Sequence, residues 1–203
     1  MKFIKENSYD IVRLFVNQIG IMIFSWVLYF AVEMAVKSQK SVFSIQTAIS
    51  VFATVFFMAL VYVAGWDFGA KDKIRIDAGR QSYIRLKGVY LSLCANALNF
   101  LCGVICVIAL GIFLASDAAW GYTVFGYANI PLRILESNFL GICNAIFASL
   151  KSDPVNYGYY FWQSVGFLIF PLLPVAATQF GYSMGVRNRR VADLFSGKTS
   201  KRS

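Results

Sequence analysis

Four long apolar runs constrain the fold of this chain more than any other feature of its sequence. They cover residues 14–32, 41–66, 88–116 and 154–186, and none of them contains Asp, Glu, Lys or Arg. A helix rises ~1.5 Å per residue, so each run is about long enough to cross the ~30 Å hydrocarbon core of a bilayer. We therefore predict an all-α integral membrane protein, built as a bundle of four transmembrane helices.

The positions of the cations predict how this bundle is oriented. From the N-terminus onwards, the five segments outside the runs hold three, two, six, two and six Lys and Arg residues. Because four crossings alternate the sides, fifteen of the 19 cations fall on one side of the membrane and four on the other. Lys and Arg are retained on the cytoplasmic side of short loops, so we expect both termini in the cytoplasm.

Composition agrees with a membrane location. Hydrophobic residues make up 58% of the chain and charged residues 14%, against ~25% charged residues in a soluble domain. A net charge of +9 is also found in nucleic-acid-binding proteins. Here the excess charge lies on one face, where anionic lipid headgroups match it better than nucleic acid does. At 203 residues the chain has room for one transmembrane domain and no separate soluble domain.

We expect transmembrane helices over residues 11–36, 42–69, 88–115 and 157–186, an outer segment over 117–153 and a basic cytoplasmic tail over 187–203. The first helix is expected to be retained, because no small-residue cleavage site follows it. Within the outer segment, residues 134–150 include a 14-residue uncharged stretch that is short for a span. A re-entrant or interfacial helix fits this stretch better than a fifth crossing, which would place the basic tail outside.

The ends of the second and fourth expected helices repeat one pattern. Residues 65–73 and 181–189 share a glycine, an aromatic residue, a second glycine and two cations that flank Asp or Asn. Two tandem helical hairpins in parallel orientation would explain the repeat. The alternative is that small, aromatic and basic residues are common wherever helices leave a membrane.

The glycine pairs in this repeat are candidates for close helix packing. Gly65 and Gly69 form one pair, and Gly181 and Gly185 form the other. A pair four residues apart lets another backbone approach one helix face. We favour packing within the chain over a homo-oligomer contact, because both pairs lie at the membrane boundary. Glycines that end a helix where the chain bends away are the other explanation.

Residues 65–80 read Gly-Trp-Asp-Phe-Gly-Ala-Lys-Asp-Lys-Ile-Arg-Ile-Asp-Ala-Gly-Arg, and Leu86-Lys87-Gly88 follow. This stretch resembles a pattern in small multi-pass membrane proteins of low-GC Gram-positive bacteria. The resemblance covers one loop and its weaker echo in the fourth helix. It implies a location in the bacterial cytoplasmic (inner) membrane, and it implies no activity, ligand or mechanism.

Polar side chains inside the spans are the better candidates for a functional site. With the orientation above, seven of them fall in the cytoplasmic leaflet: Arg13, Asn17, Gln18, Asn96, Asn99, Thr178 and Gln179. They would suit a water-filled cavity open to the cytoplasm, as a transport site needs. The alternative is hydrogen bonding between helices, worth ~0.6 kcal/mol per contact. No acidic residue is expected deep in a span, and this argues against a proton-coupled pump.

The basic cytoplasmic segments are the candidate contact surface for a protein partner or anionic lipid. Their cations include Lys71, Lys73, Arg75, Arg80, Arg85, Arg187, Arg189 and Arg190. Membrane topology alone explains the number of cations. It does not explain Asp67, Asp72 and Asp77, which we expect to form salt bridges that shape the loop. Exposed pairs of this kind contribute only ~0–1 kcal/mol each.

The remaining residues argue against an enzyme, a metal and a cofactor. The chain has no His, the commonest general base, and none of the usual nucleophile, phosphate-binding or zinc motifs. Its four cysteines lack metal-ligand spacing, so we expect them to pack as small apolar residues. Pro171 and Pro174 interrupt the fourth helix, where we expect a static kink rather than a hinge or a cation site.

These observations favour a non-enzymatic multi-pass membrane protein. The leading hypothesis is a subunit or adaptor that docks a membrane or cytoplasmic partner through its basic face. The alternative is a small transporter or channel with a polar cavity open to the cytoplasm. Substrate, partner and oligomeric state are not encoded in any motif of the sequence.

Overall fold

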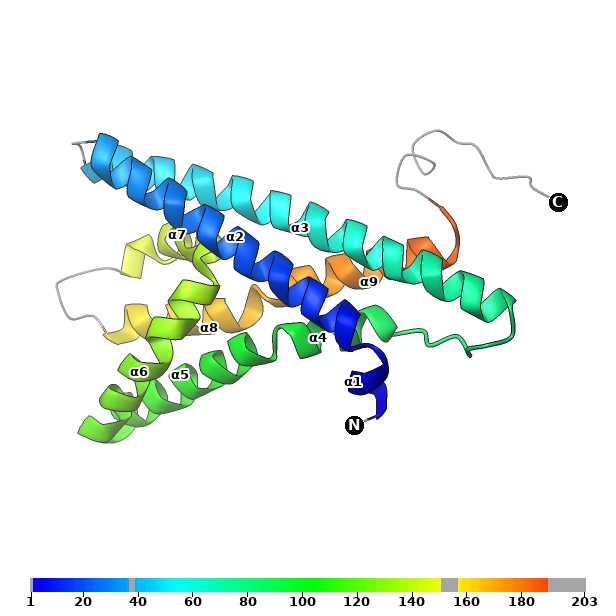
Figure 1. Ribbon diagram of the computed structural model, residues 1–203. Helices are drawn as coiled ribbons and strands as arrows, with labels where there is room; N and C mark the ends of the chain where they lie inside the picture. Colours follow the sequence, from blue (N-terminus) through cyan, green and yellow to red (C-terminus); the bar gives the residue numbers. More distant parts are fainter. Residues whose placement is uncertain (1, 37–38, 151–156, 190–203) are drawn as a thin grey trace.

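The computed structural model describes residues 2–36, 39–150 and 157–189, and these residues form helices joined by short turns, without a strand (Figure 1). The helices are α1 (Lys2–Glu6), α2 (Ser8–Ala35), α3 (Gln39–Asp77), α4 (Lys87–Ala95), α5 (Ala97–Ser116), α6 (Ala119–Leu135), α7 (Ser137–Ile146), α8 (Tyr157–Ile169) and α9 (Leu172–Val186), with a 3-10 turn at Ala148–Leu150. Four helical stretches are long and apolar enough to cross a membrane. The prediction of an all-α chain is thereby confirmed, with four helices that suit a membrane crossing by length and composition.

Helix α3 is longer than the sequence predicted. At ~1.5 Å per residue its 39 residues extend ~58 Å, about twice the thickness of the hydrocarbon core. The expected end near residue 69 is wrong because ion pairs one turn apart support further helix, at 3.1 Å between Asp67 and Lys71 and 3.0 Å between Lys73 and Asp77. The helix ends where Gly79 adopts a positive φ of 69°.

Two expected helices are broken near their middle. The stretch 88–115 divides into α4 and α5 at Asn96, whose backbone and side-chain N–H groups both donate to the Ser92 carbonyl, at 2.9 and 2.8 Å. The fourth span divides into α8 and α9 at Pro171, which has no N–H to continue the helix. The halves stay paired, because α4 packs against α9 and α5 packs against α8.

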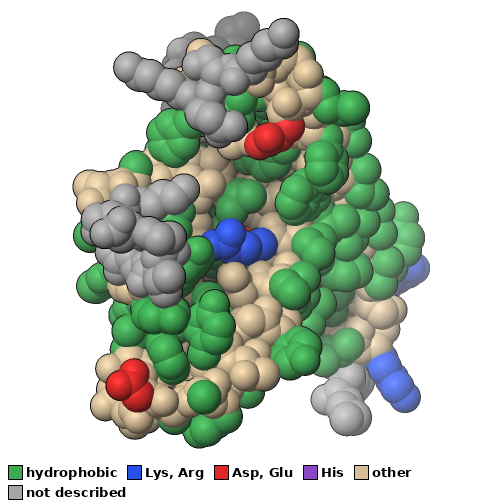
Figure 2. Space-filling model, turned by 90° about the vertical axis from the view of Figure 1, so that its left-hand side faces the viewer, with side chains coloured by type: hydrophobic (Ala, Val, Ile, Leu, Met, Phe, Trp, Pro, Cys, Tyr) green, Lys and Arg blue, Asp and Glu red, His purple; other side chains and the backbone are tan. Residues whose placement is uncertain are grey.

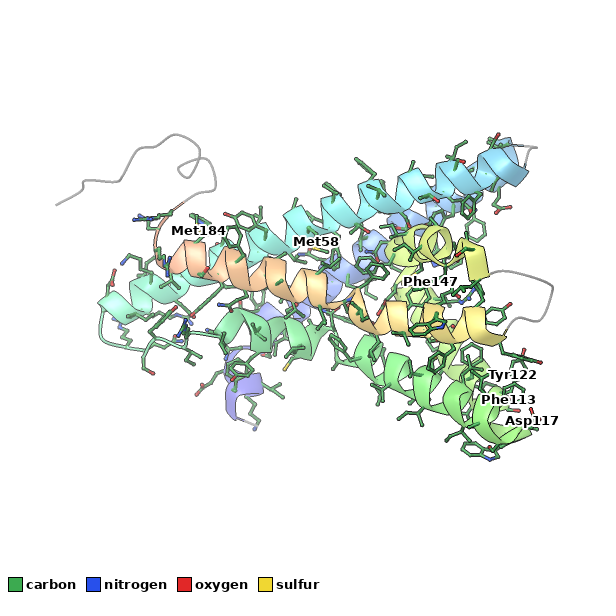
Figure 3. The ribbon with its side chains drawn as sticks, turned by 180° about the vertical axis from the view of Figure 1, so that it is seen from behind. Met58, Phe113, Asp117, Tyr122, Phe147 and Met184 are labelled. Atoms are coloured by element: carbon green, nitrogen blue, oxygen red, sulfur yellow. The ribbon has the colours of Figure 1, made fainter. Side chains whose placement is uncertain are left out.

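Beyond the breaks, α5 diverges from α3, and α6 and α7 occupy the space between them (Figure 1). Helix α5 ends at Asp117, which has a left-handed φ of 52°, and α6 then folds back along α5. An aromatic cluster holds this turn, with ring centroids 5.5 Å apart for Phe113 and Tyr122 and 4.8 Å for Phe113 and Tyr157 (Figure 3). Helix α7 returns from the centre and packs against α3.

The apolar core has two parts that follow this division. One part joins α2, α3, α4 and α9, with Phe57, Phe68 and Leu91 among its buried side chains. The other joins α5, α6, α7 and α8 around Leu132 and Phe167. Met58 contacts both parts, and Figure 3 shows it near the middle of the bundle.

The closest packing in the protein lies between α3 and α9, which run in the same direction. A Cβ atom added to Gly65 would lie 2.4 Å from the Thr178 carbonyl oxygen, and one added to Gly69 would lie 2.2 Å from that of Tyr182. The contact is reciprocal. A Cβ atom on Gly181 would meet the Tyr62 carbonyl oxygen at 2.2 Å, and one on Gly185 would meet that of Trp66 at 2.1 Å. All four glycines therefore admit the backbone of the opposite helix.

A single methyl group at this contact tests how much the bundle depends on it. We expect Gly185→Ala to force α3 and α9 apart and to lower the free energy of unfolding by ~1–3 kcal/mol, the usual cost of overpacking. The measurement is the thermal midpoint of the purified protein in detergent. Gly20→Ala is the matched control, because a Cβ atom there meets nothing within 4 Å. Equal midpoints for the two variants would contradict the proposed dependence.

Candidate functional site

One end of the bundle carries most of the candidate residues, and we call it the basic end. It comprises the last three turns of α3, the loop of residues 78–86, the start of α4 and the end of α9. At its centre, the Lys87 ammonium lies 2.8 and 3.1 Å from the two carboxylate oxygens of Asp72, and the Tyr182 hydroxyl donates to Asp72 at 3.0 Å. The exposed fractions are 1% for Lys87, 2% for Asp72 and 0% for Tyr182. These three residues form a buried ionic lock between α3, α4 and α9.

The lock forms because α4 begins directly against α9. A Cβ atom on Gly88 would lie 2.8 Å from the Gln179 Cα atom, so only glycine allows this approach. The Gln179 side chain accepts from the Val89 N–H at 3.1 Å and donates to the Arg85 carbonyl at 2.9 Å. Gln179, expected in a polar cavity, therefore caps the start of α4 instead.

Arg13 also forms contacts at the basic end. Its guanidinium donates to the Asp67 carboxylate and lies 5.5 Å from the centre of the Phe68 ring. Asp67 also accepts from Lys71 at 3.1 Å. These contacts fasten α2 to α3, and Arg13 pairs across the helices rather than entering a cavity.

The other candidate cations that the structure describes are exposed. Side chains of Lys71, Lys73 and Arg75 are 51%, 40% and 60% exposed. Arg80, Arg85, Arg187 and Arg189 are exposed, and Arg190 lies outside the described residues. Lys87 was not singled out from the sequence, because a count of cations does not separate a buried lysine from its exposed neighbours. The expected salt bridges of Asp67, Asp72 and Asp77 are all present.

The remaining candidates for a cavity are mostly bonded within their own helices. Asn96 donates to Ser92, and Asn99 lies 3.5 Å from the Asn96 side chain. Thr178 donates to the Pro174 carbonyl at 2.7 Å. Gln18 is buried and Asn17 half-buried on α2. Neither of the two hollows described below is lined by any of these residues.

A second polar cluster, unforeseen in the sequence, lies at the opposite end of the bundle. Arg133 on α6 donates from Nε to Asn129 at 3.2 Å and from Nη2 to the Gln163 side-chain oxygen. Gln163 in turn donates to Asn144 at 2.7 Å and to the Tyr159 hydroxyl at 3.2 Å. The chain of hydrogen bonds links α6, α8 and α7. Its signal in the sequence was the one arginine of the outer segment 117–153.

Glu136 lies next to this cluster, where α6 meets α7, and it corrects an expectation. The sequence placed it among the outer charges, yet the structure buries it completely. Neither of its carboxylate oxygens has a hydrogen-bond partner among the described residues. The cause is the insertion of the α6–α7 junction between α2, α3 and α5, which no local pattern in the segment specified. Glu136 is thus a buried acidic side chain, like Asp72, but it lies outside the four helices that are long and apolar enough to cross a membrane.

Two hollows open near this opposite end. One has a volume of about 510 Å³ and is lined by Tyr122, Thr123, Phe125, Gly126, Tyr127, Asn129, Ile130, Arg133 and Tyr160. The other has a volume of about 410 Å³ and is lined by Trp26, Tyr29, Phe30, Glu33, Gln46, Leu140, Gly141 and Asn144. Figure 2 shows this end of the molecule, with a cationic side chain in a central depression among hydrophobic residues.

The described residues hold neither a metal-binding group nor a disulfide. No group of three His, Cys, Asp or Glu side chains there is placed to hold a metal ion. Cys102, Cys106 and Cys143 are free and buried, and Cys94 is half-buried.

Comparisons with protein-family models, curated proteins and solved structures gave no match. The function is therefore argued from the geometry of this chain alone.

The buried lock predicts an asymmetric response to mutation. Lys87→Met leaves the buried Asp72 carboxylate with only the exposed Arg75 guanidinium, 4.0 Å away, as its counter-ion. We therefore expect this variant to lose ~3–5 kcal/mol of stability. Adding Asp72→Asn to Lys87→Met removes the orphaned charge and should restore part of that loss. Lys73→Met is the control, because its pair with Asp77 is exposed and worth at most ~1 kcal/mol. Chemical unfolding in detergent measures all four proteins. A Lys87→Met protein as stable as Lys73→Met would refute the lock.

Proposed function

We propose that the protein is a non-enzymatic subunit or adaptor of a membrane complex, and that its basic end is the docking surface. One observation carries the proposal: α3 continues as one rigid helix through Lys71–Asp77, beyond its apolar stretch, and the ionic lock fixes it to α4 and α9. Cations on a rigid helix lose less conformational freedom on binding than cations on a mobile loop. Arg75 is exposed on this helix, and Arg80 and Arg85 are exposed in the loop that joins it to α4.

The proposal includes an orientation in a bacterial cytoplasmic membrane. The basic end, with both termini, faces the cytoplasm, because fifteen of the 19 cations then lie on that side. Helices α6 and α7 then form a re-entrant hairpin that enters from the outer side and returns to it. The parallel direction of α3 and α9, and the glycines they share, support two tandem helical hairpins, α2–α3 and the pair formed by α4–α5 and α8–α9.

Cysteine labelling tests this orientation. We expect a membrane-impermeant maleimide to label Ser116→Cys in intact cells, since this exposed residue ends α5 on the proposed outer side. Ser82→Cys, exposed in the basic loop, should react only after the membrane is permeabilised. The unmodified protein gives the background from its own cysteines. Labelling of Ser82→Cys in intact cells would reverse the orientation and remove the basis for cytoplasmic docking.

The partner that fits the basic end presents acidic groups. Exposed guanidinium groups bind carboxylates or phosphates through paired hydrogen bonds. An acidic surface on another protein and the anionic headgroups of the cytoplasmic leaflet both offer them. The order imposed by the lock favours a protein surface of fixed shape, because lipid headgroups need no such order to bind cations.

Charge reversal separates docking from simple topology. The triple variant Arg75→Glu, Arg80→Glu and Arg85→Glu should lower the recovery of a stoichiometric partner at least tenfold after gentle purification from native membranes. The triple Arg→Lys variant keeps the charge and should lose much less. Quantitative mass spectrometry compares the two with the unmodified protein, at matched expression. If every co-purifying protein stays in place after charge reversal, the docking proposal fails.

A small transporter or channel is the second candidate, and one observation favours it. Glu136, Gln18 and Ser25 are buried, with side-chain oxygens that bond no described residue. Buried ionisable residues inside a membrane commonly mark ion or proton pathways. Gln18 belongs to the polar set expected from the sequence. Other members of that set are hydrogen-bonded to protein groups, so they add less to this candidate.

Ion flux into liposomes that contain the protein tests the transporter or channel candidate. If it holds, proteoliposomes of the unmodified protein should pass protons under an imposed membrane potential, and Glu136→Gln should abolish that flux. Asn99→Leu should reduce the flux if the sequence-predicted polar set takes part. Flux no greater than that of empty liposomes would exclude a proton pathway through Glu136.

A further inference from the structure

We propose that the hollow around Arg133 binds an oxyanion, a phosphate or carboxylate group, carried on an apolar or aromatic body. The site lies at the opposite end from the docking surface and does not depend on it. Arg133 is the one cation among the residues that line the hollow of about 510 Å³. A volume of this size suits a small organic molecule or a lipid headgroup.

The charge of Arg133 lacks a counter-ion within the described part of the chain. Its two hydrogen bonds go to the neutral side chains of Asn129 and Gln163. Glu136 lies three residues further along the chain, yet its oxygens bond no described residue. A half-buried guanidinium without an anion carries a desolvation cost, and an anionic ligand would relieve that cost.

The guanidinium is held in a fixed orientation. Asn129 binds its Nε atom, and Gln163 binds Nη2 while being held itself by Asn144 and Tyr159 at 2.7 and 3.2 Å. The Tyr160 ring lies 5.8 Å from the guanidinium carbon. Arginine has five N–H donors in a planar fork, so donors remain after these two bonds. A fork that is already ordered binds an oxyanion with little further loss of entropy.

The walls of the hollow indicate what the anion is attached to. Phe125, Tyr127 and Tyr160 provide aromatic surface, and Thr123 adds a hydroxyl group. Tyr127 is 76% exposed, although such a ring is usually covered. Tyrosines are typical of the layer between hydrocarbon and water, where phospholipid phosphates lie. The same chemistry suits a soluble aromatic or aliphatic phosphate or carboxylate.

The test uses two probes and the full-length protein purified in a neutral detergent. Phenyl phosphate represents a soluble ligand, and dioleoylphosphatidylglycerol represents a lipid headgroup. Binding is followed by native mass spectrometry and by the shift of the thermal midpoint during titration. We expect at least one probe to bind, and Arg133→Gln to weaken it at least tenfold. Arg133→Lys should retain an intermediate affinity, because it keeps the charge but not the fork.

Two further variants keep the test independent of folding. Tyr127→Ala changes an exposed wall residue, so it should fold normally and bind several-fold more weakly. Lys5→Gln removes an exposed cation outside both candidate sites and should bind both probes as the unmodified protein does. Binding of the lipid alone assigns the site to a headgroup, and binding of phenyl phosphate assigns it to a soluble anion. If neither probe binds, or if Arg133→Gln binds as tightly as the unmodified protein, the proposal is overturned.

Discussion

The backbone contact between α3 and α9 is the interaction on which the rest of this structure depends. Within a bilayer, lipid tails are as apolar as leucine, so helices gain little from hiding hydrophobic surface and associate by close packing instead. Four glycines bring the two backbones together. That approach places Tyr182 against Asp72 and sets Gln179 at the start of α4. Close packing of the two backbones therefore positions the basic end, and its ion pairs follow from that packing.

The two helix breaks have the opposite effect at the other end. Asn96 and Pro171 bend adjacent helices, so the bundle opens and admits α6 and α7. This insertion carries Arg133 and Glu136 into low-polarity surroundings, where each charge needs compensation that water would supply at the surface. The fold consequently has one end that presents its charges and one end that encloses them. The basic end suits docking, and the opposite end suits ligand binding or ion transport.

The basic end also shows why equal charges have unequal roles. Lys87 and Lys73 are 14 residues apart in one basic segment, and each pairs with an aspartate. The pair of Lys73 is open to water, which screens it, whereas the pair of Lys87 is almost fully buried. Burial makes the pair of Lys87 important for the stability of the fold, because a buried charge without its partner is much more costly than an exposed one.

The sequence by itself determined the helical class, the number of long apolar helices and the break at Pro171, because length, hydropathy and a missing N–H act locally. It also placed Gly65, Gly69, Gly181 and Gly185 on helix faces suited to close approach. Only the tertiary structure decided that these glycines face each other and that Lys87 rather than its neighbours is buried. It alone moved Arg133 and Glu136 from an expected outer segment into the bundle. These outcomes depend on which helices become neighbours, and burial and pairing of a charge are properties of that arrangement, not of the residues around it in the chain.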